Sequence, residues 1–317
     1  MKKITALLLT AALALSMAGC NAVSIDGSSS SSSGNDSASS ADAGTGTGSV
    51  GLSISTMNNP FFVTLSEGAE AKANELGVEL ISVDAGDDSA KQAGDIEDLI
   101  SKGIKVLIVN PVDSDAVAPA VEAAIGKGIK VISVDRIVNG VEVDCSIASD
   151  NVAGARLAAE YLVEQVGEGA KAVELEGVSG ASATIDRGAG FHEVADEKLN
   201  VCASQTANFN RAEGMTVMEN MLQANPDVQC VFAHNDEMAL GAIEALGGKD
   251  VLVAGFDATD DAIAAVKEGR MAATVAQKPD LMGATAVETA QKLMNGETVE
   301  KSIPVEVKLV TKDNADE

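Results

Sequence analysis

The chain from residue 50 alternates between short apolar runs and segments with helical spacing. An apolar run at 50–55 is followed by a turn signal, Asn59-Pro60. Apolar residues then recur at intervals of three and four until Gly77, a residue type typical of helix C-terminal caps. This pattern predicts a strand, a loop and a helix in that order.

The same unit recurs along the first half of the chain. Strands are predicted at 78–83, 104–109 and 129–134, with helices over 90–101 and from Ser114 onward, and segment 102–109 has a close copy in 127–134. Each strand is a continuous apolar run, as expected when both faces of a sheet are covered. Alternating strands and helices at this spacing predict a parallel, doubly wound α/β sheet.

The rhythm starts again after Ser149. A helix is predicted over 153–164 and strands near 172–175, 201–205, 230–233 and 252–254. A folded region of this length usually divides into two domains. The expected fold class is therefore α/β, with two doubly wound parallel-sheet lobes.

The N-terminus has the pattern of an export signal. Lys2 and Lys3 precede an apolar run at 4–15, and small residues lead to Cys20. The run is shorter than the roughly 20 residues of a bilayer span. We predict a lipoprotein signal peptide over 1–20 with lipidation of Cys20, although Met17 stands where the motif usually has Leu. A plain secretory signal is the alternative.

Residues 21–48 are rich in Ser and Gly and predict a flexible tether between the anchor and the folded region. The protein is therefore expected outside the cytoplasm, anchored to the outer face of the cell membrane, or in a periplasm if a second membrane is present. The net charge of −26 argues against binding nucleic acid. Cys145, Cys202 and Cys230 are an odd, widely spaced set that implies neither a disulfide framework nor a metal site.

Unusual residues gather where the predicted strands end, which is where open α/β sheets bind ligands. The chain has six Phe, one Tyr and no Trp, and four of the Phe fall at these ends. Arg187 is expected in the loop after Leu175. The candidate binding residues are Ser55, Asn59, Phe61, Phe62, Asn110, Asp135, Arg136, Arg187, Phe209, Asn235, Phe256, Asp257 and Gln277.

This combination suits a small sugar. Planar polar side chains can each bind two adjacent hydroxyls, and aromatic rings pack against the C–H faces of the sugar ring. Two Arg set against two Asp leave the site formally neutral, which favours an uncharged ligand. No cofactor or metal is implied.

Four stretches carry a resemblance to a known family: STMNNPFF at 55–62, NP with DSDAV at 110–117, IASDN at 147–151 and NDEMALGA at 235–242. From about residue 50 to 312 the chain resembles the ribose-binding members of the pentose and hexose family of periplasmic binding proteins. The resemblance implies D-ribose as the ligand, with the nine polar candidates as hydrogen-bonding partners, Ser55 a minor one, and the four Phe as stacking walls.

The resemblance also implies an organisation. The chain would cross between lobes three times, so that 49–149 and 278–306 form the N-terminal lobe and 150–277 and 307–317 the C-terminal lobe. A monomer whose lobes close on the sugar by hinge bending would deliver it to the membrane permease of an ABC transporter. Delivery to a membrane sensor or chemoreceptor is the alternative use.

Other functions fit less well. An enzyme could use Asp135 and Asp257 as acid and base, but each has an Arg nearby and no activated nucleophile is apparent. His192 and His234 are isolated in sequence and are interpreted as structural or surface groups. The effector domain of a transcriptional regulator would need a basic DNA-binding segment where the signal and tether stand. Another pentose, allose or a furanose-like signal remains open as the ligand.

Overall fold

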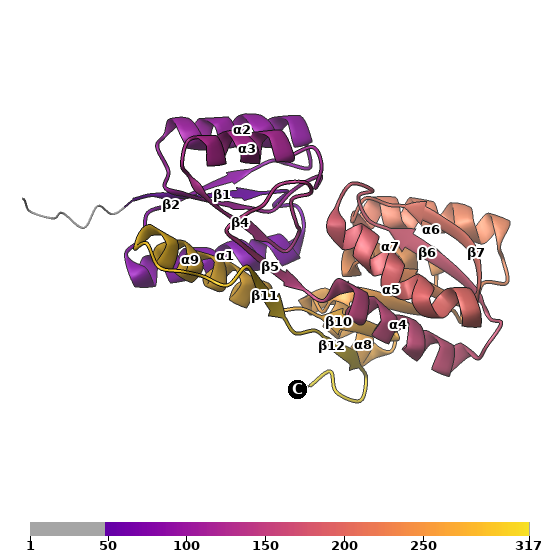
Figure 1. Cartoon of the computed structure of the whole chain (residues 1–317). Coiled ribbons are helices and arrows are strands. Elements are labelled where there is room, and N and C mark those ends of the chain that lie inside the picture. The colour runs from indigo at the N-terminus through magenta and orange to yellow at the C-terminus, as the bar shows by residue number, and fades with distance from the viewer. Residues whose placement is uncertain (1–47, 317) are drawn as a thin grey trace, which may run out of the picture. The chain divides into compact units, whose positions relative to one another are not determined.

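The computed structural model describes residues 48–316, which belong to one compact unit. Within this range the chain forms two six-stranded sheets, each with helices on both faces (Figure 1). The first sheet has the order β11-β5-β4-β3-β1-β2, with bounds Ser302–Val305, Cys145–Ser149, Lys130–Val134, Val106–Val109, Val50–Ile54 and Leu80–Asp84. The second has the order β12-β10-β9-β8-β6-β7, with bounds Lys308–Thr311, Ala273–Ala276, Leu252–Asp257, Cys230–Ala233, Lys171–Glu176 and Asn200–Thr206.

The first sheet packs between two pairs of helices. Helices α1 (Pro60–Leu76) and α9 (Pro279–Met294) cover one face, where Leu52 and Ile108 are fully buried. Helices α2 (Ser89–Ser101) and α3 (Ala118–Gly126) cover the other face. The continuous apolar strands are thus explained, because successive side chains enter two different cores.

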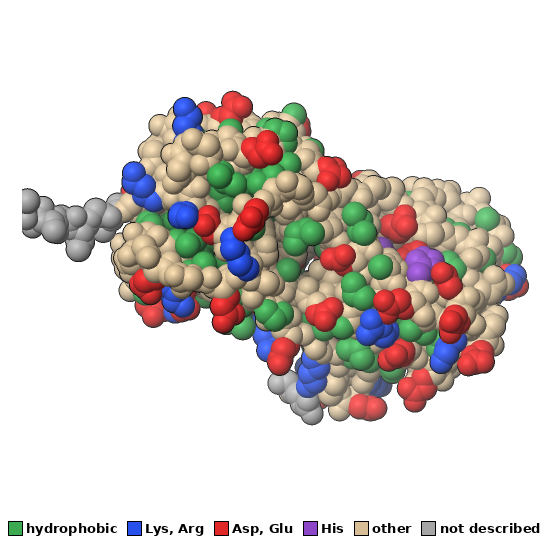
Figure 2. All heavy atoms as spheres, in the orientation of Figure 1, with side chains coloured by type: hydrophobic (Ala, Val, Ile, Leu, Met, Phe, Trp, Pro, Cys, Tyr) green, Lys and Arg blue, Asp and Glu red, His purple; other side chains and the backbone are tan. Residues whose placement is uncertain are grey.

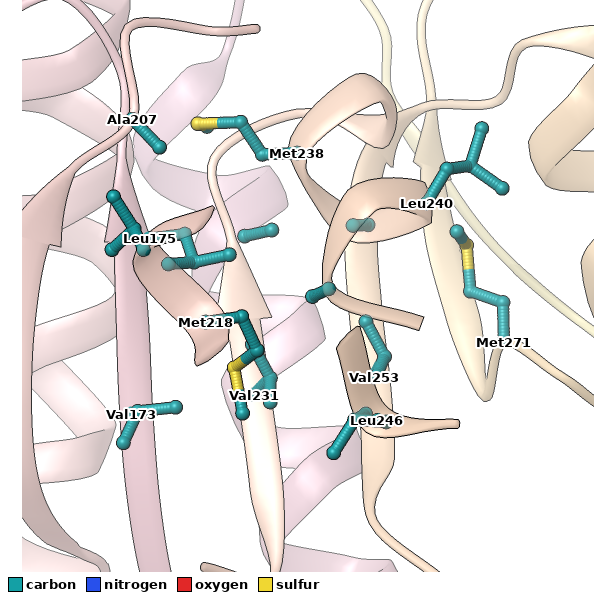
Figure 3. Close-up of a cluster of buried hydrophobic side chains, with 14 of the residues drawn as sticks. Val173, Leu175, Ala207, Met218, Val231, Met238, Leu240, Leu246, Val253 and Met271 are labelled. Carbon is teal, nitrogen blue, oxygen red and sulfur yellow. The ribbon is translucent and has the colours of Figure 1, made fainter. Parts of the chain in front are cut away.

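The second sheet is covered by five helices in the described range. On one face, α6 (Arg211–Ala224), α7 (Asp236–Leu246) and α8 (Asp260–Glu268) enclose the cluster shown in Figure 3. On the other, α4 (Asn151–Val166) and α5 (Ser182–Lys198) pack on Phe232 and Val275. The chain passes between the sheets after β5, between β10 and α9, and between β11 and β12.

The duplicated segment of the sequence is a structural repeat. Gly103 and Gly128 both have φ 79°, a left-handed conformation that glycine adopts without strain. Each glycine ends the turn after a helix, and the following Ile104 and Ile129 are buried just before the next strand begins. The two copies therefore place β3 and β4 in adjacent, parallel positions.

The predicted fold class is confirmed, with local differences. Neighbouring strands are parallel except β10 and β12, which pair antiparallel. Strands β5, β11 and β12 were not predicted. Strand β5 alternates buried and half-buried positions and is not an apolar run, and β11 is a short edge strand that contains Pro304, a residue that weakens a strand prediction. Helix α3 begins at Ala118 and not Ser114, because Asp113 first forms a turn by accepting bonds from the N–H groups of Asp115 and Ala116.

None of the helices in residues 48–316 is long and apolar enough to cross a membrane. The signal peptide, Cys20 and the tether expected at 1–48 lie almost wholly outside the described residues.

Candidate ligand-binding site

The thirteen candidate residues converge at the carboxyl ends of the two sheets. None of them is more than 8% exposed, so their polar groups are largely withdrawn from water. Nine line one narrow cavity together with Ala183: Asn59, Phe61, Phe62, Asp135, Arg136, Arg187, Phe209, Asn235 and Asp257. The remaining four lie directly behind or beside these: Ser55, Asn110, Phe256 and Gln277.

Two asparagines reach the site as helix caps. Asn59 caps α1 by accepting a bond from Phe61 N–H at 3.0 Å, and Asn235 caps α7 by accepting one from Met238 N–H at 3.0 Å. In both cases the amide oxygen is used for the cap. The side-chain N–H₂ groups are thereby held at the carboxyl end of the sheet as donors.

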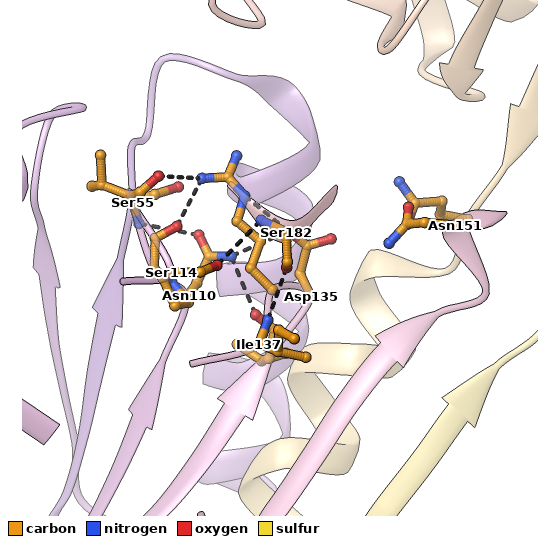
Figure 4. A network of polar contacts seen from close by, with 12 residues as sticks. Ser55, Asn110, Ser114, Asp135, Ile137, Asn151 and Ser182 are labelled. Atoms are coloured by element: carbon orange, nitrogen blue, oxygen red, sulfur yellow. Dashed lines mark hydrogen bonds and ion pairs between the residues drawn. The ribbon is translucent and has the colours of Figure 1, made fainter. Parts of the chain in front are cut away.

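The polar half of the first lobe centres on Asp135 (Figure 4). Asn110 donates to Asp135 Oδ2 at 3.2 Å and accepts from Ser55 N–H at 3.2 Å. Arg136 Nε lies 3.6 Å from the same Asp135 oxygen, and Arg136 Nη1 donates to the Pro111 carbonyl at 2.8 Å. These contacts fix the carboxylate while Asp135 Oδ1 makes no hydrogen bond among the described residues.

The second lobe repeats the arrangement around Arg187 and Asp257. Arg187 Nη1 lies 3.7 Å from Asp257 Oδ1, to which Gln277 Nε2 donates at 2.7 Å. Arg187 Nε donates to Asn151 Oδ1 at 2.8 Å. The prediction that Arg187 lies in a loop is wrong: the residue belongs to α5, whose helical geometry aims the guanidinium at this contact. Asn151, in the stretch IASDN, was not chosen as a site residue.

Aromatic rings and guanidinium groups are stacked in the cavity. Arg136 Cζ lies 5.2 Å from the centre of the Phe62 ring and 5.3 Å from that of Phe209, so it joins rings of both lobes. Arg187 Cζ lies 3.9 Å from the centre of the Phe256 ring. Arginine is weakly hydrated and tolerates this position over a ring face.

Burial sets the electrostatics of the site. It raises the pKa of Asp135 and Asp257 and lowers the pKa of Arg136 and Arg187, while the opposite charge of each neighbouring partner counteracts the shift. The count of two Arg against two Asp made from the sequence left out a third buried carboxyl group, that of Asp236. Burial raises the pKa of Asp236 to about 7, although it accepts bonds from Thr274 and Thr259.

Several features distinguish the cavity from an ordinary closed core. Asp135 Oδ1, Arg136 Nε, Gln277 Oε1 and Ser55 Oγ are buried yet make no hydrogen bond among the described residues. Non-glycine residues with left-handed backbone also lie here, including Asp135 (φ 63°) and Phe209 (φ 59°). Unpaired polar atoms and backbone strain both carry a cost that a function can explain.

The cavity is narrow at its centre and wider on both sides. The central space is about 10 Å³, and both arginines line it. Cavities of about 260 Å³ and 340 Å³ adjoin it, the first sharing Phe62, Arg136 and Phe209 and the second sharing Phe61 and Asp257.

The histidines lie outside this cavity. They were interpreted as isolated, but both bind one carboxylate: His234 Nε2 is 2.8 Å from Glu174 Oε1, and His192 Nε2 is 3.1 Å from Glu174 Oε2. The His234 carbonyl accepts from Arg187 Nη1 at 2.6 Å, which links this pair to the site. No group of three or more metal-ligating side chains suited to a metal ion occurs in the described residues.

Known proteins share this fold and sequence. Residues 50–298 match the family described as periplasmic binding protein domain. The chain is 50% identical over 264 residues to the ribose import binding protein of Bacillus subtilis (strain 168). The aligned region covers 83% of this chain and 87% of that protein.

Two solved structures are also similar. An ABC transporter solute binding protein from Bacillus halodurans C-125 with bound myo-inositol has a TM-score of 0.81 and 34% identity, covering 86% of this chain and 96% of that one. A periplasmic solute binding protein from Actinobacillus succinogenes 130z with bound D-allose has a TM-score of 0.79 and 31% identity, covering 85% and 99%.

Proposed function

The chain belongs to the periplasmic binding protein family, and from this premise we propose that it is the sugar-binding component of an ABC importer, with D-ribose as its ligand. It is a binding protein and not an enzyme, like the relatives it matches. The site between the lobes would hold the sugar, and the permease would receive it.

The observation that carries the proposal is the pairing of two Arg–Asp sets with three aromatic rings in one buried cavity, with a fourth ring, Phe256, stacked against Arg187. Carboxylate, guanidinium and amide groups supply directed partners for hydroxyls, and the rings supply flat apolar faces. Two Arg set against Asp135 and Asp257, with a further buried carboxyl at Asp236, leave no excess of positive charge, and this favours an uncharged polyol over a phosphate or carboxylate.

Ribose is favoured over other sugars by the sequence relatives. The Bacillus subtilis protein is named for ribose import and is more similar in sequence than the solved proteins that hold myo-inositol or D-allose. Entry of the sugar would move the Arg136 and Arg187 side chains from between the rings toward its hydroxyls.

The lobes would consist of 49–149 with 278–306 and of 150–277 with 307–317, and would close by bending at the three crossovers. A ligand that contacts both lobes binds the closed state more tightly than the open one, which is the physical condition for such a switch. Arg136 stacked between Phe62 and Phe209 already joins the two halves. A membrane sensor could read the same closed state, so the transport role is tested by deleting the gene and measuring ribose uptake.

Isothermal titration calorimetry of the full chain tests the ligand. We expect 1:1 binding of D-ribose, with arabinose, xylose, allose, galactose, glucose and myo-inositol as comparisons. If another sugar gave binding heat and ribose gave none, ribose would be refuted as the ligand, but the proposal that the protein binds a sugar would stand.

We propose further that Cys20 is lipidated and anchors the protein outside the cytoplasm through the tether at 21–48. Small residues before the cysteine and the short apolar run support this. Metabolic labelling with an alkyne-bearing fatty acid should mark the wild type and not Cys20→Ala; equal labelling of both would place the lipid elsewhere.

A further inference from the structure

Two buried serines connect the lobes beside the cavity without lining it. Ser114 lies in the loop after β3 of the first lobe, and Ser182 is the first residue of α5 in the second. Ser182 N–H donates to Ser114 Oγ at 3.2 Å, and Ile137 N–H donates to Ser182 Oγ at 3.0 Å (Figure 4). Ser114 N–H also donates to the Gly180 carbonyl at 2.8 Å.

The hydrogen bonds that the two hydroxyl oxygens accept join one lobe to the other. The effect on α5 is specific: its N-cap residue, Ala181, has no side chain able to cap the helix. The N–H of Ser182, which has no partner within the helix, instead donates to Ser114 of the opposite lobe. The first turn of α5 is therefore capped in trans, and only when the lobes are together.

Both ends of this contact are tied to arginines of the site. Helix α5 also carries Arg187, five residues after Ser182. On the other side, Ile137 directly follows Arg136, and the loop that leads to Ser114 supplies the Pro111 carbonyl bound by Arg136. Neither serine lines the central cavity or its two neighbours.

We propose that Ser114 and Ser182 are positioning residues that latch the lobes in the closed arrangement and so set the affinity for every sugar the pocket binds. The inference rests on the proposed function and deepens it. Because the latch touches no sugar, it contributes equally to all of them. It forms after the sugar has entered, so it slows dissociation and leaves association unchanged.

Close packing at Gly180 agrees with a contact designed to close. A Cβ at this position would lie 1.8 Å from Asp113 Oδ2 of the first lobe. Asp113 cannot turn away freely, because its Oδ1 accepts from the N–H groups of Asp115 and Ala116. Gly180→Ala should therefore keep the lobes apart while leaving each lobe intact.

The test compares Ser114→Ala, Ser182→Ala and Gly180→Ala in the full chain. Removing one hydroxyl should weaken binding of D-ribose, and of any second sugar the wild type binds, by the same factor of roughly three to ten. The dissociation rate should rise by that factor in stopped-flow measurements. Gly180→Ala should lose at least as much, and adding Asp113→Ala should restore part of the loss.

Ser133→Ala is the matched control, since Ser133 is also buried and donates to another serine, Ser146, but within the first sheet. Its affinity should equal that of the wild type. Unchanged affinity in Ser114→Ala and Ser182→Ala, or an equal loss in Ser133→Ala, overturns the latch. A wild type that binds no sugar overturns the proposed function itself, and the latch with it.

Discussion

The Glu174 carboxylate and the His234 imidazole lie 2.8 Å apart in the interior of the second lobe, where both are buried. Burial acts to raise the pKa of Glu174, but hydrogen bonds from His234 and Ser204 and the proximity of His192 outweigh it and hold the pKa below its ordinary value. Burial lowers the pKa of His234, so this ring is a neutral donor. The other carboxylate oxygen of Glu174 lies 3.1 Å from Nε2 of His192, which is half-buried at the surface.

This arrangement predicts a loss of stability at alkaline pH. Burial acts to lower the pKa of His192, but bonds with Asp196 and Glu174 outweigh it and raise the pKa above 6.5. The folded state therefore holds the proton more tightly than the unfolded chain. The stabilisation is complete below about pH 6.5 and is lost as the pH rises through the raised pKa of the folded state.

Urea denaturation from pH 6 to pH 9 measures this effect. The free energy of unfolding of the wild type should fall across the range, whereas His192→Gln should show a flatter profile. A parallel decline in both proteins would assign the effect to another group.

The sequence predicted the architecture well because its signals are local. Short apolar strands, glycine-ended helices and the copied segment at 102–109 and 127–134 each follow from neighbouring residues. Strands β5, β11 and β12 were not predicted, because they form by pairing with strands distant in sequence and their own residues carry no clear strand pattern. Helix position is likewise decided by capping, as Asp113 shows for α3.

The site was predictable in part for the same reason. Polar residues and Phe at the ends of predicted strands can be assigned to one site from the sequence, because parallel strands bring their carboxyl ends together. Asn151 and Asp236 are different: they stand at helix starts, where Asn and Asp are common caps, and only the fold shows that they hold Arg187 and Thr259. The trans contact of Ser114 and Ser182 has no sequence signal, since it joins residues of two lobes.

Arg187 should be indispensable for binding. Its removal leaves Asp257 buried without its cation, in addition to deleting contacts to the sugar. Loss of one member of a buried pair costs about 3–5 kcal/mol of folding stability. Each lost hydrogen bond from the guanidinium to the sugar costs about 1.5–3 kcal/mol, roughly ten- to a hundredfold in affinity. Calorimetry should detect no ribose binding by Arg187→Ala, and Asn235→Ala should behave alike. Arg156→Ala, which removes an exposed arginine paired with Glu193, is the control and should bind normally. Retained affinity in both site variants would move the site elsewhere.

Asp236 should act on the sugar through the turn that carries Asp257. Thr274 Oγ1 donates to Asp236 Oδ1 at 2.7 Å and accepts from Ala258 N–H at 3.2 Å, next to Asp257 with its left-handed φ of 124°. Thr274→Val keeps the shape but leaves both partners unsatisfied, at about 1–3 kcal/mol for each buried group. We expect ribose affinity to fall about tenfold. Thr289→Val, at a buried position of α9 in the first lobe, is the control. Equal affinities of the two variants would show that the turn does not need this bond.

The last prediction concerns the surface on which Phe209 rests. A Cβ added at Gly177 would lie 2.0 Å from Cζ of the Phe209 ring, so the ring lies directly on the glycine backbone. Arg136 Cζ is 5.3 Å from the centre of the same ring, and both residues line the cavity. Gly177→Ala should push Phe209 into the cavity and weaken ribose binding by more than tenfold, as measured by calorimetry. Gly94→Ala provides the control, because a Cβ there meets nothing within 4 Å and α2 should gain about 0.5–1 kcal/mol of stability from the better helix former. If Gly177→Ala bound ribose as tightly as Gly94→Ala, the Phe209 ring would not be a wall of the binding site.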